Sequence, residues 1–123
     1  MKIDLSVVVC SLNEIKNISK SYEEVYAAAA KRNVAYEVIF VDNGSTDGTK
    51  EYLSSIVHSN VKMIFNKIDI GKGGSIKRAI RESRGEYVAI HDPDGEYSGY
   101  DLWDLYDEAT INGADLALGS RNL

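Results

Sequence analysis

The sequence predicts a three-layer α/β fold, in which a doubly wound, mostly parallel sheet is covered by helices on both faces. Short continuous apolar runs alternate with stretches of helical periodicity along the chain. The apolar runs lack the alternation of a half-exposed strand, so both faces of each strand are expected to be buried. No repeat, low-complexity stretch or linker interrupts the alternation. Strand, helix and strand in succession build parallel units and a single Rossmann-like domain.

Five strands are expected where the apolar runs are continuous. They cover Leu5–Cys10, Tyr36–Val41, Val61–Phe65, Tyr87–Ile90 and Leu116–Leu118. Continuous apolar runs of this length, bounded by turn residues, are typical of strands buried in a parallel sheet.

Four helices are expected between these strands. Their apolar positions recur at spacings of three and four residues, which place them on one helix face. The first carries Ile15, Ile18, Tyr22, Val25, Tyr26 and Ala29; the second carries Tyr52, Leu53 and Ile56; the third carries Ile76, Ala79 and Ile80; the fourth lies around 102–111. Residues 45–48 supply capping side chains for the second helix, and residues 71–74 lead into the third.

Composition and charge restrict the classes of function. The chain has 123 residues, of which 44% are hydrophobic and 27% charged, as in one ordinary globular domain. The net charge of -5 disfavours a nucleic-acid partner. No apolar run approaches the roughly 20 residues of a membrane span, and the start of the chain does not resemble a signal peptide. We expect a cytoplasmic protein, with the membrane surface as the alternative location.

The single cysteine, Cys10, excludes an internal disulfide. It ends an apolar run, and no histidine is near it in sequence. A buried structural thiol is therefore favoured over a nucleophile.

Polar side chains follow four of the predicted strands, at the point where each strand ends. They are Ser11, Asn13 and Glu14; Asp42, Asn43 and Ser45; residues 66–74; and Asp92, Asp94 and Glu96. In parallel sheets, ligands bind outside the carboxyl ends of the strands. The convergence of these four groups predicts a ligand site at this edge of the sheet.

Asp92-Pro93-Asp94 is the predicted metal site. Residues two apart in an extended segment point to the same side, so both carboxylates can face one ion, and Pro93 stiffens the segment. Mg²⁺ and Mn²⁺ prefer such oxygen ligands and commonly share them with substrate phosphates. A surface turn is the alternative, because Asp-Pro and Asp-Gly are common turn pairs.

The glycine-rich segment from Gly71 to Ser75, which includes Lys72, is a candidate phosphate contact at a helix start. Its spacing is not that of a Walker motif, and a tight strand-to-helix connection is the alternative. Asp42 can accept a hydrogen bond from a base or ribose. The alternative interpretation of the segment that follows Asp42 is structural: Asp47 and Ser45 would simply cap the next helix.

Other conspicuous residues have a structural interpretation beside the functional one. Lys77, Arg81 and Arg84 are expected on a solvated helix face balanced by Glu82 and Glu86, rather than at a phosphate or membrane. His91 is either a packed imidazole or an orienting partner for an aspartate. Three further aromatic residues are expected to pack the fourth helix: Tyr97, Tyr100 and Trp103.

Taken together, these segments resemble the family-2 glycosyltransferases of the GT-A fold, in the branch of dolichyl-phosphate mannose synthase and other polyprenyl-phosphate glycosyltransferases. The resemblance runs nearly end to end. It is carried by residues 6–14 (SVVVCSLNE), 37–49 (EVIFVDNGSTDGT), 66–84, 92–94 (DPD) and 117–121 (ALGSR).

The resemblance implies roles for individual residues. The nucleotide-binding set would be Ser11, Asn13, Glu14, Asp42, Gly71, Lys72, His91 and Asp92, and the metal set Asp92, Asp94 and Glu96. It further implies a UDP- or GDP-linked sugar donor, Mg²⁺ or Mn²⁺ as cofactor, and single displacement with inversion. Neither acceptor nor catalytic base is assigned, although a polyprenyl phosphate is a candidate acceptor.

The sequence departs from the family pattern at three motif positions and in its length. Cys10-Ser11-Leu12 stands where the family usually has a proline or a similar residue before its Asn-Glu pair; Asn43 stands where a second aspartate is frequent, and Pro93 where alanine is frequent. Family domains usually continue well beyond this length. Residues 1–123 are therefore expected to be one nucleotide-sugar-binding domain lacking the acceptor-binding half, and an exposed sheet edge makes a homo-oligomer an expectation.

Three alternatives remain or are set aside. A nucleotide-binding module without transferase activity stays open, since binding without turnover fits the same residues. A phosphoacceptor receiver is disfavoured because the ends of strands one, three and five lack its aspartates and lysine. A nucleotidyltransferase is disfavoured because no glycine-rich signature follows strand one.

Overall fold

A five-stranded sheet forms the middle layer of the computed structural model, which describes residues 2–30, 32–93, 103–104, 106–107 and 117–118. The strands are β1 (Ile3–Ser11), β2 (Tyr36–Asp42), β3 (Val61–Phe65), β4 (Gly85–His91) and β5 (Ala117–Leu118). Their order is β3-β2-β1-β4-β5, and each of these pairings is parallel. The predicted doubly wound sheet is thus confirmed.

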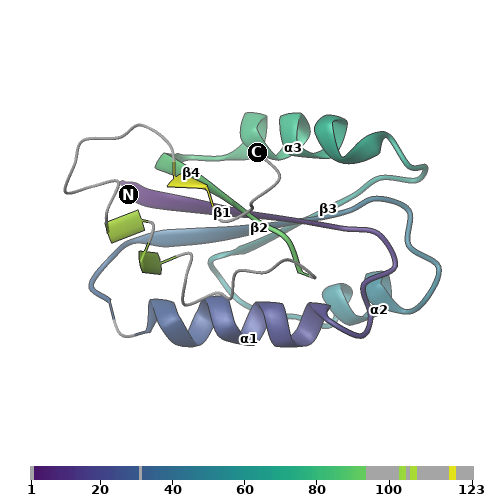
Figure 1. The fold of residues 1–123 in the computed structure, drawn as a ribbon, viewed down its shortest axis with the longest axis horizontal. Helices are drawn as coiled ribbons and strands as arrows, with labels where there is room; N and C mark the ends of the chain where they lie inside the picture. Colours follow the sequence, from purple (N-terminus) through teal and green to yellow (C-terminus); the bar gives the residue numbers. More distant parts are fainter. Residues whose placement is uncertain (1, 31, 94–102, 105, 108–116, 119–123) are drawn as a thin grey trace.

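Helices cover both faces of this sheet (Figure 1). They are α1 (Ile18–Ala29), α2 (Thr49–Ser54) and α3 (Gly71–Glu82). Helices α1 and α2 lie on one face and α3 on the other, which makes the three layers that the sequence predicted. Residues 103–104 and 106–107, in the expected fourth helix, are also helical.

Alternate residues of the central strands belong to different cores. On β1, Leu5, Val7 and Val9 pack in the cluster that includes α1, whereas Val8 packs in the cluster with Ala79 of α3. On β2, Val38 and Phe40 pack in the cluster that includes α1, whereas Ile39 and Val41 pack in the cluster with Ala79. Side chains of a strand point alternately to its two faces, so two cores require the continuous apolar runs seen in the sequence.

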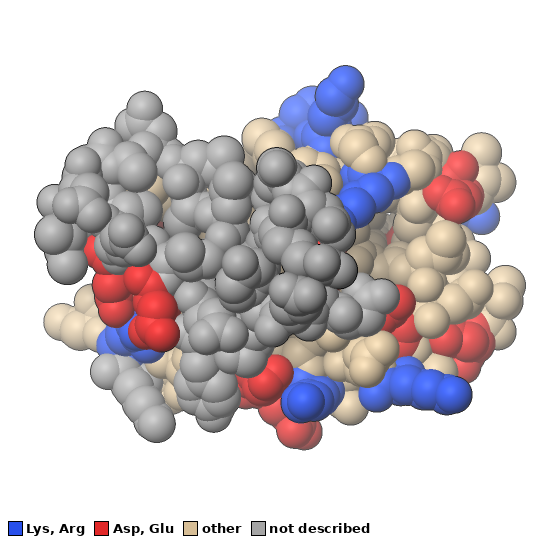
Figure 2. All heavy atoms as spheres, viewed as in Figure 1, with Lys and Arg blue, Asp and Glu red and all other residues tan. Residues whose placement is uncertain are grey.

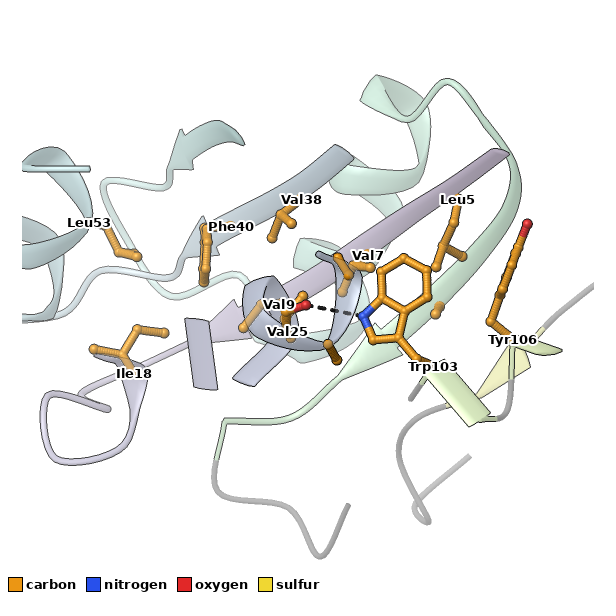
Figure 3. Close-up of a cluster of buried hydrophobic side chains, with 13 residues drawn as sticks. Leu5, Val7, Val9, Ile18, Val25, Val38, Phe40, Leu53, Trp103 and Tyr106 are labelled. Carbon is orange, nitrogen blue, oxygen red and sulfur yellow. Dashed lines mark hydrogen bonds between the residues drawn. The ribbon is translucent and has the colours of Figure 1, made fainter. Parts of the chain in front are cut away.

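Trp103 closes the larger core on the α1 side (Figure 3). It is fully buried, and its indole N–H donates to the carbonyl of Val25 at 3.1 Å. A buried tryptophan needs such a partner for its one donor. The expectation that Trp103 packs the fourth helix is confirmed, while Tyr97 and Tyr100 lie outside the described residues.

Three local predictions were wrong. Helix α1 begins at Ile18, so Ile15 belongs to the preceding loop and is 38% exposed. The glycine-rich segment does not precede α3 but forms its first turn, because the helix starts at Gly71 with a left-handed φ of 81°. Ile80 of α3 is exposed rather than buried, since Ala79 already faces the sheet.

Candidate functional site

A cavity of about 310 Å³ lies at the carboxyl ends of the strands. Its described lining comprises Cys10, Ser11, Leu12, Glu14, Asn43, Asp69, Gly71, Lys72, Ser75, Asp92 and Pro93. Cys10 and Ser11 end β1, and the other lining residues follow β1, β2 and β4, precede α3 or lie near its start. The strand order reverses between β1 and β4, and such switch points are where open α/β sheets bind ligands.

Lys72 and Asp92 face each other across this cavity. The ammonium nitrogen of Lys72 lies 2.7 Å from Oδ1 of Asp92. Asp92 comes directly after β4 and its side chain is 11% exposed, whereas the Lys72 side chain, from the first turn of α3, is 44% exposed. The carboxylate is thus held at the wall, where a cation already fits beside it.

A second group of contacts ties the loop between β3 and α3 to the end of β2. Asn43 donates from Nδ2 to Oδ1 of Asp69 at 2.6 Å, and its Oδ1 accepts the backbone N–H of Ile70 at 2.9 Å. The same Asp69 oxygen accepts the N–H of Gly71 at 2.7 Å. These bonds hold one wall of the cavity in place.

Reciprocal hydrogen bonds join the loops that follow β1 and β2. The N–H of Asn13 donates to Oγ of Ser45 at 2.9 Å, and Oδ1 of Asn13 accepts the N–H of Thr46 at 2.8 Å. The N–H of Glu14 donates to Oγ1 of Thr49 at 3.0 Å. Asn13 has a left-handed φ of 55°, a conformation that asparagine tolerates well. Ser45 therefore binds the neighbouring loop rather than capping α2.

Asp47 takes over the helix-capping contact. Its Oδ1 accepts the N–H of Thr49 at 3.0 Å, the first residue of α2, and its Oδ2 accepts the N–H of Ile15 at 3.1 Å. The hydroxyl of Thr49, first, and then these backbone donors lower the pKa of Asp47. The N-cap residue is Gly48, which makes no side-chain hydrogen bond, so neither Ser45 nor Asp47 is the simple cap that was predicted; Asp47 bonds the first N–H of α2 from the position before the cap.

Asp42 is a buried carboxylate with spare hydrogen-bonding capacity. It ends β2 and is 1% exposed. Its Oδ2 accepts the N–H of Ser45 at 3.0 Å, whereas Oδ1 has no hydrogen-bond partner among the described residues. An uncompensated buried acceptor costs free energy, so its presence requires an explanation.

Cys10 lines the cavity as a half-buried thiol. Its pKa is raised to about 11, chiefly by burial; Lys72 opposes this rise and the nearby Asp92 adds to it, each by a smaller effect. The thiol is therefore protonated at neutral pH, as a structural cysteine is and a nucleophile is not. The thiol is half-buried rather than buried as predicted, and its structural role stays a prediction.

The cavity brings together five of the eight predicted nucleotide-binding residues: Ser11, Glu14, Gly71, Lys72 and Asp92. The other three lie at the same edge but outside the lining. Asn13 joins two loops, Asp42 is buried beneath them, and His91 is 2% exposed at the end of β4. Asp94 and Glu96 lie outside the described residues.

Asn43, Asp69 and Ser75 also line the cavity; the sequence placed them in the polar segments at this edge but did not assign them to the nucleotide-binding set. The signal for Asp69 was weak, because one aspartate in a polar loop is ordinary. Within the described part of the chain, no group of three His, Cys, Asp or Glu residues forms a metal cluster. Asp92 is the one predicted metal ligand that this part contains.

The surface over α3 is basic. Figure 2 shows Lys and Arg side chains gathered there, at the top of the view. Lys77 and Arg81 are exposed, as expected of a solvated face. The predicted balance differs in detail: Glu82 lies 3.9 Å from Lys62 and Glu86 lies 3.1 Å from Lys2. In the ranges that the structure describes, no helix is both long and apolar enough to cross a bilayer.

Known proteins similar to this chain share one family. The profile of Glycosyl transferase family 2 matches residues 6–123. The dolichyl-phosphate beta-glucosyltransferase of Dictyostelium discoideum is 30% identical over 98% of this chain and 40% of its own length. The human dolichyl-phosphate beta-glucosyltransferase is 38% identical over 74% of this chain and 31% of its own length.

Solved structures give the same result. TarS 1-349 of S. aureus in complex with UDP-GlcNAc has a TM-score of 0.69 at 25% identity, and the match covers 90% of this chain and 32% of that TarS chain. The mannosyltransferase PcManGT of Pyrobaculum calidifontis, in complex with GDP-Man and Mn²⁺, has a TM-score of 0.67 at 24% identity and covers 84% of this chain and 31% of its own. The chain thus spans well under half the length of these relatives. It belongs to glycosyl transferase family 2 and has the GT-A fold.

Proposed function

We propose that residues 1–123 form the domain of an inverting glycosyltransferase that binds a nucleotide-diphospho-sugar together with a divalent metal. The cavity at the switch point, with Lys72 and Asp92 2.7 Å apart on its walls, carries the proposal. A diphosphate needs positive charge around it, and a metal ligand needs a carboxylate beside that diphosphate. The Lys72 ammonium and the Asp92 carboxylate already lie together in the cavity where the diphosphate and the metal would bind.

We propose a role for each nucleotide-binding residue from its position at this edge of the sheet. The spare Oδ1 of Asp42 would accept a hydrogen bond from a base N–H, which would remove the cost of leaving it unpaired. Glu14 and Ser11, which line the cavity, would contact the ribose side of the nucleotide. Asn13 and His91 would complete the set by supporting these loops and strand ends. Gly71 lets the start of α3 approach the diphosphate, and Lys72 would offset its charge.

The metal site is proposed at Asp92, Asp94 and Glu96. The carboxylate of Asp92 fits a hard cation, since it already has an ammonium group beside it. A bound Mg²⁺ or Mn²⁺ would supply the charge that stabilises the departing nucleoside diphosphate. Lys72, released from Asp92, would then be free to bind a phosphate oxygen. These residues orient the donor so that an acceptor oxygen can attack the anomeric carbon from the opposite side.

The acceptor class rests on the relatives. Two of them are dolichyl-phosphate beta-glucosyltransferases, so a polyprenyl phosphate is the acceptor we propose. The membrane surface would then be the place of action. A nucleotide-binding module without transfer activity is the second candidate, because the chain spans 40% or less of these two relatives. Sugar transfer to dolichyl phosphate would exclude this module, and binding without turnover would support it.

Calorimetric titration with UDP and GDP, each with and without Mn²⁺, tests the binding proposal. We expect metal-dependent affinity for one of the nucleotides and its loss in Asp94→Ala. Asp104→Ala is the matched control, because Asp104 is exposed and pairs with Arg32 at 3.4 Å, at the far end of α1. Binding that ignores both the metal and Asp94 would refute the site.

Self-association of the chain also remains a proposal. Strand β3 forms one edge of the sheet, and an open edge favours pairing with another chain. Light scattering across a range of protein concentrations measures it, and a constant monomer mass would contradict it.

A further inference from the structure

Four side chains form a hydrogen-bonded chain along one wall of the cavity. The guanidinium of Arg78 donates to Oδ1 of Asn66. Nδ2 of Asn66 donates to Oδ1 of Asn43 at 3.2 Å, and Nδ2 of Asn43 donates to Asp69 at 2.6 Å. Arginine can only donate and an ionised carboxylate can only accept. The two ends therefore determine the direction of every bond between them.

Residue 43 must consequently both accept and donate. Its oxygen accepts from Asn66 and from the N–H of Ile70 at 2.9 Å, which leaves its amide nitrogen for Asp69. Asn43 is 5% exposed, so solvent does not replace a lost partner there. An aspartate at position 43 could accept both bonds but could not donate the third. An amide is the side chain that this position requires.

The chain of bonds continues to the cavity's charged pair. Asp69 accepts the N–H of Gly71 at 2.7 Å, at the first residue of α3. The next residue is Lys72, whose ammonium lies 2.7 Å from Asp92. The position of Asn43, after β2, is thereby connected to a carboxylate that follows β4.

We propose that Asn43 is a positioning residue, which holds Asp69 and the start of α3 so that Lys72 faces the diphosphate subsite. The effect of Asn43 on the cavity wall rests only on its hydrogen bonds to Asp69 and Ile70 and on the bond from Gly71 to Asp69. Its effect on ligand affinity rests on the proposed function. Asn43 need not touch the nucleotide for this role.

Exchanging the hydrogen-bond donor Asn43 and the acceptor Asp69 tests the proposal. Asn43→Asp places two carboxylates at hydrogen-bond distance, and we expect UDP or GDP to bind about tenfold more weakly or worse. Asn43→Asp combined with Asp69→Asn restores the bond between the two side chains with the opposite direction and keeps the bonds that Asn66 and Ile70 donate to residue 43. The amide nitrogen that replaces Oδ1 of Asp69 does not accept the N–H of Gly71, and we expect affinity to recover to within about threefold of the original protein. Asn33→Asp makes the same chemical change at an exposed position and should leave affinity unchanged.

Amide hydrogen exchange provides a readout without nucleotide. In Asn43→Asp we expect the N–H groups of Ile70 and Gly71 to exchange about tenfold faster, with protection restored at Ile70 in the double variant. Asp69→Ala removes the acceptor without adding charge, so it covers the case in which Asn43→Asp does not fold. There the exchange should quicken at Gly71 but not at Ile70, whose acceptor is Asn43.

The outcomes separate the two proposals. If the unaltered protein binds neither nucleotide with Mn²⁺, the proposed function fails, and the exchange pattern alone decides the role of Asn43. If Asn43→Asp binds nucleotide normally, or the double variant fails to restore binding and the protection of Ile70, the positioning role is wrong.

Discussion

The two ends of the sheet each bury a carboxylate, but they treat it in opposite ways. Glu37 at the amino end of β2 is 3% exposed, and Asp42 at its carboxyl end is 1% exposed. Oε2 of Glu37 accepts the hydroxyl of Ser6 at 2.6 Å and the N–H of Arg84 at 2.7 Å, while Oε1 lies 3.6 Å from Nε of Arg84. Oδ1 of Asp42 has no such partner among the described residues.

This difference separates a structural carboxylate from a candidate binding carboxylate. At the amino end, both oxygens of Glu37 have a partner, so this network stabilises the junction between α3 and β4. At the carboxyl end, one acceptor remains available beneath the loops that line the cavity. Burial does not distinguish these two carboxylates, whereas their hydrogen-bond partners do.

The amino end should be the more sensitive of the two to a change in packing. A Cβ added at Gly85 would lie 2.4 Å from the backbone nitrogen of Ser6. The backbones of β1 and β4 would have to separate, so we expect Gly85→Ala to lower the free energy of unfolding by about 3 kcal/mol or more. Urea denaturation measures this loss, with Gly73→Ala as control because a Cβ there meets nothing within 4 Å. Equal stability of the two variants would contradict the close approach.

Removal of Glu37 should have the next largest effect, again on stability. Glu37→Ala leaves the hydroxyl of Ser6 and the N–H of Arg84 without their acceptor, and we expect a loss of about 2 kcal/mol. Nucleotide affinity should stay unchanged, because Glu37 lies at the other end of the sheet. Denaturation and titration of the same preparation measure both. A loss of affinity with intact stability would reverse the assignment of the two ends.

Asp42→Asn should show the opposite pattern. The amide oxygen can still accept the N–H of Ser45, so the change in stability should stay below about 1 kcal/mol. The second oxygen becomes a donor, which opposes a base N–H, and we expect nucleotide affinity to fall about tenfold, or 1.4 kcal/mol. Titration calorimetry checks the affinity. Unchanged affinity would remove Asp42 from the site.

The smallest effect concerns Cys10 at high pH. Its pKa rises from 9.0 to about 11 on folding because the thiol is buried. The folded protein therefore keeps a proton that the unfolded chain releases. The stability from this residue is complete below pH 9.0 and is lost as pH rises towards about 11. At pH 10 we expect a loss of about 1 kcal/mol relative to Cys10→Ser. Parallel slopes for both proteins between pH 8 and pH 10.5 would show that the thiol is not desolvated.

Much of the fold could be predicted from the chain because local patterns report burial directly. Val61–Phe65 was predicted with its observed bounds, since an apolar run between polar turns has one plausible extent. The start of α3 could not be predicted in this way, because glycines signal a turn as readily as a helix start. Only the structure shows that α3 begins at Gly71, whose N–H is held by Asp69.

The candidate site, too, could be predicted from the sequence only in part. The sequence by itself determined the α/β fold, the family and the edge of the sheet where polar residues meet, because apolar periodicity and strand ends are local properties. Only the tertiary structure decided which side chains pair there. Asn43 and Asp69 are 26 residues apart, and the buried Asp42 and Glu37 look alike in the sequence. The partner of a polar group is set by how the strands and loops pack together, and a one-dimensional pattern does not contain that information.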